Sequence, residues 1–390
     1  MKSRTRPADQ GNTACDPGPA PTTPPCCAPG GDQGPENKGL DNDRPGQQRW
    51  RFVCGWRETP LGRIPQVTTK LTATDIFGRW QMRWGLGRMR YRITPGIYAI
   101  GAPTASSPVL VTANYKMTFD FLRRDLHSHD VWVLVLETKG INVWCAAGKG
   151  TFGTEEIIRR VQATRLEQLI DHRTLILPQL GAPGTQAHRI TRATGFQIIF
   201  GPVLSADLPR FLSDGCKATP QMRQVPFTII DRLVLTPVEL VNLRKQFLWS
   251  VLVLLVLGGI GNQGFSLAAA WQRGGAAILT MATAAITGAV LVPVLLPWLP
   301  GRAFAVKGAV AGLAVGLLGI MTFPATLDGL NRFALLMATT AIASWCAMHF
   351  TGSSTFTSPS GVAREMRRAI PAQAALLLAS VLCWLATAFS

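Results

Sequence analysis

Long apolar stretches dominate the chain from about residue 246 to its C-terminus. Each stretch is close to the roughly 20 residues that a helix needs to cross a bilayer. A soluble helical bundle would show polar stripes at helical spacing, whereas these segments are apolar on all sides. The pattern predicts a transmembrane domain of about five helices over residues 246–389, with spans near Gln246–Ala270, Gly274–Leu299, Ala303–Phe323, Asn331–Phe350 and Ile370–Phe389.

Strand and helix patterns alternate over residues 51–243. Val131–Leu136 is an unbroken apolar run, which is typical of a strand buried on both faces. Further strands are expected at Val109–Thr112, Leu175–Leu177, Gln197–Phe200 and Thr228–Ile230, and helices at Met117–Leu126, Glu155–Leu169 and Ala206–Leu212. The alternation predicts an α/β, Rossmann-like domain with a doubly wound, mostly parallel sheet. Ligands of such sheets lie beyond the carboxyl ends of the strands.

Residues 1–50 are rich in Pro and Gly and contain almost no large aliphatic side chains. Such a stretch cannot bury enough apolar surface to offset the entropy that ordering costs, so we predict a disordered tail. No apolar run follows its basic start, so we do not interpret it as a secretory signal.

Basic residues predict the orientation of the membrane domain. They gather before the first expected span, between the second and third, and between the fourth and fifth, whereas the alternate loops hold only Arg273 and Arg332. Loops rich in Lys and Arg face the cytoplasm, so we expect a multi-pass protein of the inner (plasma) membrane with a cytoplasmic α/β domain. No acidic residue lies in the middle of a span, which favours an anchor over a transporter.

The net charge of +17 raises the question of nucleic acid binding. Five arginines fall in Arg79–Arg92, together with Trp80 and Trp84, and such a stretch can bind a phosphate backbone. In a membrane protein, anionic headgroups or an acidic redox partner are better explanations. We therefore expect a membrane partner and no nucleic acid.

The eight cysteines include no C-x-x-C pair, which disfavours zinc or iron–sulfur sites in this chain. His127, His129 and Asp130 form a cluster at the end of an expected helix, where surface histidines are common. Cys216 is interpreted as a structural cysteine of a loop.

Two nucleotide-binding signatures fit the segment after Leu136 poorly. Gly148, Gly150 and Gly153 match G-x-G-x-x-G, but they lie about a dozen residues beyond the strand, where the dinucleotide turn should follow at once. Lys149 is followed by Gly150 where a P-loop requires Ser or Thr.

A short capped helix explains the same segment better. Asn142 can cap a helix that places Val143, Trp144 and Cys145 in its first turn. Unpaired N–H groups and the positive end of the helix dipole there favour a thiolate at Cys145. Small residues at Ala146, Ala147 and Gly148 would let a flat macrocycle lie against the helix, with Lys149 one turn after Cys145. The simpler alternative is that Cys145 is a small buried apolar residue.

The segment 142–154, NVWCAAGKGTFGT, closely resembles the cap-helix motif of the mercury-methylating corrinoid proteins. The resemblance extends over the chain beyond the Pro-rich tail and includes the C-terminal spans, through Pro95–Gly101, Ser107–Leu126, Leu177–Gly184, Gly195–Val203 and Ala206–Arg223. The α/β domain is also similar to the corrinoid iron–sulfur protein of the acetyl-CoA pathway, a family that lacks the anchor and this cysteine.

The resemblance implies a base-off corrinoid (cobalamin) whose cobalt takes Cys145 as its lower axial ligand, with Cys145 as the catalytic residue. The other expected cofactor contacts are Asn142, Val143, Trp144, Ala146, Ala147, Gly148, Lys149, Gly150 and Thr151. From strand-end geometry we also expect contacts from Gln179–Gly184 and Gly201–Pro202.

The implied reaction is methyl transfer to Hg(II), forming methylmercury. The implied electron donor is a ferredoxin with two [4Fe–4S] clusters, and the expected methyl donor is a methylated folate or pterin, or its protein. Two alternatives share the same residues: a membrane-bound corrinoid methyl carrier of one-carbon metabolism with mercury as a side substrate, and a non-catalytic corrinoid-binding membrane sensor.

Overall fold

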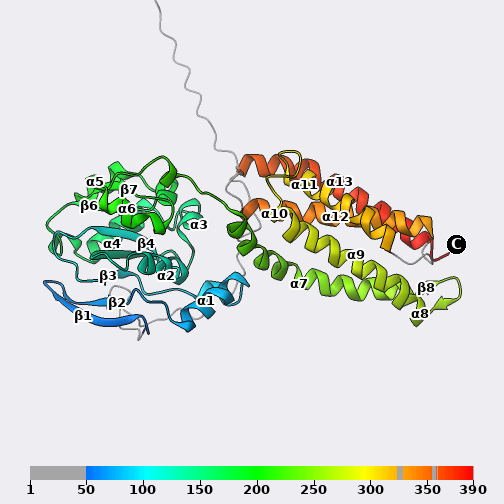
Figure 1. The fold of residues 1–390 in the computed structure, drawn as a ribbon, viewed down its shortest axis with the longest axis horizontal. Coiled ribbons are helices and arrows are strands. Elements are labelled where there is room, and N and C mark those ends of the chain that lie inside the picture. Colours follow the sequence, from blue (N-terminus) through cyan, green and yellow to red (C-terminus); the bar gives the residue numbers. More distant parts are fainter. Residues whose placement is uncertain (1–49, 323–327, 354–356, 358, 390) are drawn as a thin grey trace, which may run out of the picture.

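The computed structural model describes residues 50–322, 328–353, 357 and 359–389, and it contains an α/β domain followed by a bundle of long helices (Figure 1). The predicted disordered tail lies outside the described residues, apart from Trp50. The two parts are distinct in Figure 1 and are joined by the segment that leads into helix α7 (Ile229–Gly259).

The α/β domain is built on a seven-stranded sheet with the order β1-β2-β3-β5-β4-β6-β7. Its strands are β1 (Val53–Thr59), β2 (Gly62–Val67), β3 (Gly96–Ile100), β4 (Val109–Ala113), β5 (Val131–Leu136), β6 (Thr174–Leu177) and β7 (Gln197–Phe200). Strands β5, β4, β6 and β7 run parallel, whereas β1 and β2 form an antiparallel hairpin and β3 is antiparallel to β5. The predicted parallel-rich α/β domain is confirmed, and the Rossmann-like label stays a prediction.

Helices cover both faces of the sheet, as the buried runs of β4 and β5 require. On one face the core includes side chains from α3 (Val143–Gly148), α4 (Thr154–Ala163) and α5 (Ala187–Thr194). On the other face it includes side chains from α2 (Lys116–Asp125) and α6 (Leu208–Ser213). Helix α1 (Ala73–Arg83) lies at the edge that faces the helix bundle (Figure 1).

Two local predictions differ from the structure, and three strands of the α/β domain were not predicted. Thr228–Ile230 is not a strand: Thr228 caps α7 in a reciprocal pair with Asp231, and Ile229 and Ile230 are exposed in its first turn. The helix expected over Glu155–Leu169 ends at Ala163, because Arg165 takes a left-handed conformation (φ 44°) before a short 3-10 turn. Strands β1, β2 and β3 were not predicted. Half-buried residues alternate with exposed ones in β1, neither β1 nor β2 contains a long apolar run, and β3 is only five residues long and begins with a glycine.

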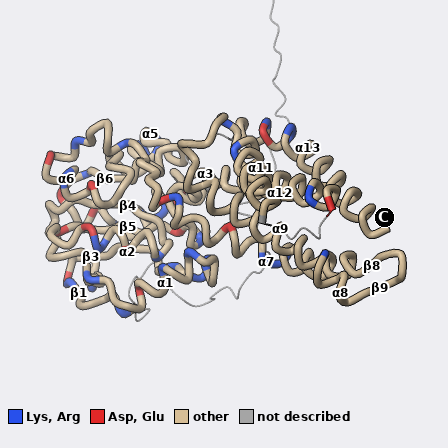
Figure 2. The backbone as a smooth tube through the Cα atoms, turned by 45° about the vertical axis from the view of Figure 1, so that its right-hand side comes forward, with Lys and Arg blue, Asp and Glu red and all other residues tan. Residues whose placement is uncertain are grey.

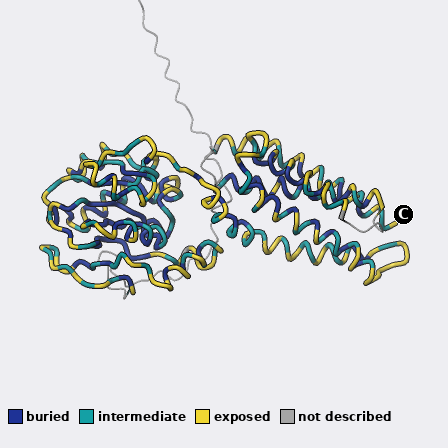
Figure 3. Tube along the Cα trace, in the orientation of Figure 1, coloured by how far each residue is buried: buried dark blue, intermediate teal, exposed yellow. Residues whose placement is uncertain are grey.

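Within the described residues, five helices are long and apolar enough to cross a membrane. The C-terminal elements are α7 (Ile229–Gly259), the hairpin β8 (Ile260–Gly261) and β9 (Gly264–Phe265), α8 (Leu267–Ala269), α9 (Gly275–Ile286), α10 (Val292–Val294), α11 (Phe304–Thr322), α12 (Gly329–His349) and α13 (Pro359–Ala386). Two π-helical stretches, Ala270–Gly274 and Thr287–Leu291, join α8, α9 and α10 into one span. Figure 3 shows exposed residues along the outer sides of these helices. Helix α7 continues without a break through the boundary expected at residues 243–246.

The segment between α6 and α7 is packed at both ends. Met222 is buried in the core of the α/β domain, against the α2 and α6 layer. Phe227, in a left-handed conformation (φ 46°), is buried in a cluster with Leu296, Phe304 and Phe350 at the near end of the helix bundle. The chain therefore fastens one domain to the other within five residues.

Helices α11 and α12 approach closely because glycines line their contact. Gly308, Gly312 and Gly316 lie four residues apart, so they share one side of α11. A Cβ atom on Gly312 would lie 2.8 Å from the Cβ of Ala343 and 2.8 Å from the carbonyl oxygen of Thr339. Small residues at this spacing let helix backbones pack directly in a membrane environment.

Replacing Gly312 with Ala should separate α11 from α12 and destabilise the helix bundle by about 1–3 kcal/mol, the usual cost of overpacking. The midpoint of thermal unfolding of the detergent-solubilised protein measures this effect. Gly275→Ala is the matched control, because an added Cβ at Gly275 meets no atom within 4 Å. Equal midpoints for the two variants would show that the glycine contact does not limit helix packing.

Candidate functional site

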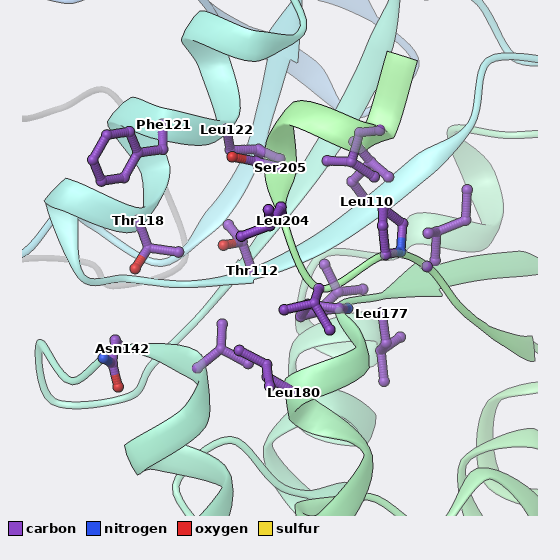
Figure 4. Close-up of a pocket in the computed structure, with 18 of the residues that line it drawn as sticks. Leu110, Thr112, Thr118, Phe121, Leu122, Asn142, Leu177, Leu180, Leu204 and Ser205 are labelled. Carbon is purple, nitrogen blue, oxygen red and sulfur yellow. The ribbon is translucent and has the colours of Figure 1, made fainter. Parts of the chain in front are cut away.

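A cavity lies where the strand order changes direction. From β4 the chain forms β5 on one side, and it then returns past β4 to form β6 and β7 on the other side. Open α/β sheets bind ligands at such a point, outside the carboxyl ends of the strands. A cavity of about 280 Å³ occupies this place, lined by residues of β4, α2, the start of α3, β6 and the segment after β7. In Figure 4, Thr118 and Phe121 of α2 lie on one side of it and Asn142 on another.

The buried side chain of Asn114 holds the loop that leads to α3. Its Oδ1 accepts hydrogen bonds from the Thr138 backbone N–H (3.1 Å), the Thr138 hydroxyl (2.9 Å) and the Gly140 N–H (3.0 Å). Its Nδ2 donates to Glu137 (2.8 Å). Lys139 and Gly140 both have positive φ values, 57° and 71°. One side chain at the end of β4 thus stabilises an unusual turn at the end of β5.

The predicted cap of α3 is confirmed. The Oδ1 atom of Asn142 accepts a hydrogen bond from the backbone N–H of Cys145 at 3.0 Å. Cys145 therefore lies in the first turn of α3 and is half-buried. Asn142, Val143 and Trp144 line the cavity, whereas Cys145 is not among its lining residues.

The predicted contact residues lie on two sides of α3. Trp144, Gly148, Lys149 and Gly150 are exposed. Ala146 and Ala147 are buried in the core with Val143, so the close packing of α3 on the domain explains their small size. Thr151 follows α3, where its backbone N–H donates to the Ala146 carbonyl (2.9 Å).

The two loops that were expected to contact the cofactor, Gln179–Gly184 and Gly201–Pro202, both reach the cavity. Leu180 of the first loop lines it, as do Gly201 and Pro202 of the second. The glycines of the first loop serve packing instead: a Cβ on Gly181 would clash with the Phe152 ring, and one on Gly184 would clash with the backbones of Phe152 and Ala147. This loop therefore packs directly against α3 and the residues that follow it.

Positive charge lies close to Tyr115. Tyr115, just beyond β4, is buried, and its phenol hydrogen-bonds Arg88. Burial raises the pKa of Tyr115, the guanidinium groups of Arg88 and Arg83 oppose that rise, and negative charge at Cys145 adds to it. Two guanidinium groups and Cys145 thus act on the same phenol. The Arg83–Arg88 segment therefore lies near Tyr115, which follows β4 directly.

The remaining candidates have local structural roles. Gly148 ends α3, Gly150 forms a left-handed turn (φ 77°), and Gly153 precedes α4, so these glycines form a helix–turn–helix connection here. Asp130 accepts a hydrogen bond from the Ala102 N–H (2.6 Å). Cys216 packs against the core in a left-handed conformation (φ 62°), and burial raises the pKa of its thiol. A raised pKa disfavours the thiolate that binds metals.

Comparison with known proteins finds a similarity within the α/β domain. Residues 87–212 match the family described as CO dehydrogenase/acetyl-CoA synthase delta subunit. The matched residues include β3 to α6 and the whole of α3. The expected similarity to a protein of the acetyl-CoA pathway is thereby confirmed for this domain. The resemblance to mercury-methylating proteins stays a prediction.

Several curated relatives share this region. The acetyl-CoA decarbonylase/synthase complex subunit gamma of Methanopyrus kandleri is 35% identical over 122 residues, which are 31% of this chain and 26% of the relative. The subunit gamma of Archaeoglobus fulgidus is 31% identical over 127 residues, which are 32% of this chain and 27% of the relative. The chain thus spans about a quarter of the length of the curated relatives it matches.

Asn114, Tyr115 and Arg88 were not singled out from the sequence. For Asn114 a signal was present, because a polar residue directly after an apolar strand lies at the ligand-binding edge of a parallel sheet. No comparable signal marks Arg88, which reaches Tyr115 only through the fold.

Asn114→Ala should destabilise the α/β domain by about 2–4 kcal/mol, because it leaves the N–H groups of Thr138 and Gly140 without their acceptor. Unfolding of the purified full-length protein, followed by heat or urea, measures the change. Asn242→Ala, at an exposed position of α7, is the control and should stay within about 0.5 kcal/mol of wild type. A similar small change for Asn114→Ala would mean that the turn holds its shape unaided.

Proposed function

We propose that this chain holds a corrinoid on α3 and uses it to transfer a methyl group to Hg(II), forming methylmercury. The observation that carries the proposal is the position of Cys145. Asn142 fixes this residue in the first turn of α3, next to a cavity at the carboxyl ends of β4 and β6. The family match over residues 87–212 supports a corrinoid methyl carrier of one-carbon chemistry.

The residues present suit a corrinoid. The outward side of α3 carries the exposed Trp144 and Gly148, and a Cβ added to Gly148 would meet no atom within 4 Å. A flat ring can therefore approach this side without displacing side chains. The neighbouring cavity is lined mostly by apolar residues, with Thr112, Thr118, Asn142 and Ser205 as polar groups for the edge of a ring.

Cys145 is the residue that would hold the cobalt of a base-off corrinoid, through its thiolate sulfur. Thiolates are soft ligands, and an axial thiolate pushes electron density toward the metal. Arg88 and Arg83 provide positive charge around Tyr115, just beyond β4. A bound corrinoid supplies the methyl–cobalt bond, and Hg(II), a soft electrophile, is the substrate that accepts the methyl group.

The long helices form the anchor in this proposal. The five apolar helices would cross the inner membrane, with the α/β domain on the cytoplasmic side. We propose a ferredoxin with two [4Fe–4S] clusters as electron donor. We propose a methylated folate or pterin, or its protein, as methyl donor.

A second function has its own support. The relatives are named as subunits of an acetyl-CoA decarbonylase/synthase complex. A membrane-bound corrinoid methyl carrier of one-carbon metabolism, with mercury as a side substrate, would use the same α3 and the same Cys145.

Cys145→Ala should change the visible spectrum of the corrinoid bound to the full-length protein, because the cobalt would lose its sulfur ligand. Cys216→Ala, at another half-buried cysteine, is the matched control and should leave the spectrum unchanged. Methylmercury formation with reduced ferredoxin should fall by more than the 10–100-fold typical of losing a group that only orients a ligand. A spectrum unchanged by Cys145→Ala would refute thiolate ligation.

The same preparation separates the two functions. The loaded protein is offered Hg(II) in one assay and a folate or thiol acceptor in another. Faster transfer to Hg(II) supports the mercury reaction. Faster transfer to the organic acceptor supports the one-carbon carrier.

A further inference from the structure

Helix α1 turns an apolar side outward. Ile76, Phe77, Trp80 and Trp84 are 44%, 64%, 64% and 41% exposed. At about 100° per residue, these four positions fall within an arc of about 100° on the helix surface. Soluble domains rarely leave several large apolar side chains side by side in water.

The inward side of α1 is polar and firmly held. Asp75 accepts hydrogen bonds from Lys116 Nζ (2.6 Å) and Arg123 (2.8 Å) in α2. Burial alone would raise the pKa of Asp75, but hydrogen bonds from Lys116 and Thr72 hold it well below its usual range. Gly78 fits tightly against Tyr91. These contacts fix the rotation of α1, so its apolar side faces outward as part of the fold.

The end of α1 lies beside α7, close to the expected membrane surface. A Cβ on Gly85 would contact Val238 (3.7 Å) and Val241 (3.9 Å) of α7. At 1.5 Å per residue, these valines precede Gln246, where the first span is expected to begin, by about 12 and 7.5 Å. The headgroup layer on each side of a bilayer is about 5–8 Å thick. The end of α1 therefore lies near the outer edge of the headgroup layer.

The charges around α1 suit an anionic lipid surface. Arg88, Arg90 and Arg92 follow the helix and are exposed. Between residues 73 and 92 the only acidic residue is Asp75, which is buried and paired. Figure 2 shows the basic positions of this stretch in blue beside α1. Arginines next to exposed aromatic residues are typical of helices that lie in the membrane interface.

We propose that α1 lies in the headgroup layer of the leaflet that faces the α/β domain, where it binds anionic phospholipid through Phe77, Trp80, Trp84 and the following arginines. The proposal rests on the membrane insertion of the long helices. The α/β domain would thus contact the bilayer directly.

Tryptophan quenching tests the depth of α1. The full-length protein is placed in nanodiscs of phosphatidylcholine and anionic phosphatidylglycerol, with bromine either near the headgroup end of the acyl chains or near the bilayer centre. In the wild-type protein, bromine near the headgroups should quench the emission of Trp80 more strongly than bromine near the bilayer centre. Trp80→Phe should remove this part of the emission. Trp56→Phe is the matched control, because Trp56 is 48% exposed on β1, far from the bundle, and its emission should not be quenched.

If neither brominated lipid quenches the emission that Trp80→Phe removes, the proposal is overturned. The apolar side of α1 would then bind a protein partner instead of lipid. Trp249, 70% exposed on α7, provides an internal reference. Quenching of Trp249 shows that the helix bundle is in the bilayer. A result in which Trp249 is quenched and Trp80 is not would therefore contradict the position of α1 without contradicting the membrane insertion of the long helices. The test needs neither corrinoid nor mercury.

Anionic lipid supplies the second readout. Shallow quenching of Trp80 should weaken when phosphatidylcholine replaces all phosphatidylglycerol, and in the Arg90→Gln/Arg92→Gln variant. If neither change alters the quenching of Trp80, lipid charge does not contribute to the binding of α1. The free headgroup analogue glycerol phosphate should not compete, because the site requires a surface.

Discussion

The hydrogen bonds of Asn114 are the constraint on which the site depends. They join the end of β4 to the turn after β5, and they keep two successive residues of that turn in left-handed conformations. This turn sets where α3 begins and hence where Cys145 lies. Parallel strands alone would bring their carboxyl ends together, but they would not direct the following helix. A buried polar group that satisfies three donors is well suited to do so, since losing it would leave those donors unpaired.

Much of the α/β domain could be predicted because its central strands are buried on both faces. Val131–Leu136 matches β5 residue for residue, and the strands expected at Val109–Thr112 and Leu175–Leu177 match β4 and β6 to within one residue, since buried apolar runs mark such strands clearly. The strand expected at Thr228–Ile230 shows the limit of that signal. Its two isoleucines are apolar because they begin a long apolar helix, and three residues are too few to separate a strand from a helical turn.

For the site, sequence reasoning found the cap and the cysteine but could not assign the small residues. Ala146, Ala147, Gly181 and Gly184 are all small, and in the structure their size serves the packing of α3 on its supporting loop. A residue that must be small for a ligand and one that must be small for a neighbour look alike in a sequence. The contact between Arg88 and Tyr115 depends on distant segments meeting, so no local pattern could reveal it.

The short connection between Met222 and Phe227 limits how far the α/β domain can lie from the helix bundle. One end is buried in the α/β core and the other in the near end of the helix bundle, so the free chain between them reaches about 18 Å at full extension. This connection, together with the contact of Gly85 with Val238 and Val241 of α7, keeps the α/β domain beside the bundle. Every encounter between the site and a soluble protein therefore takes place at a nearly constant height above the bundle. A partner has to be shaped for that narrow space as well as for the site itself.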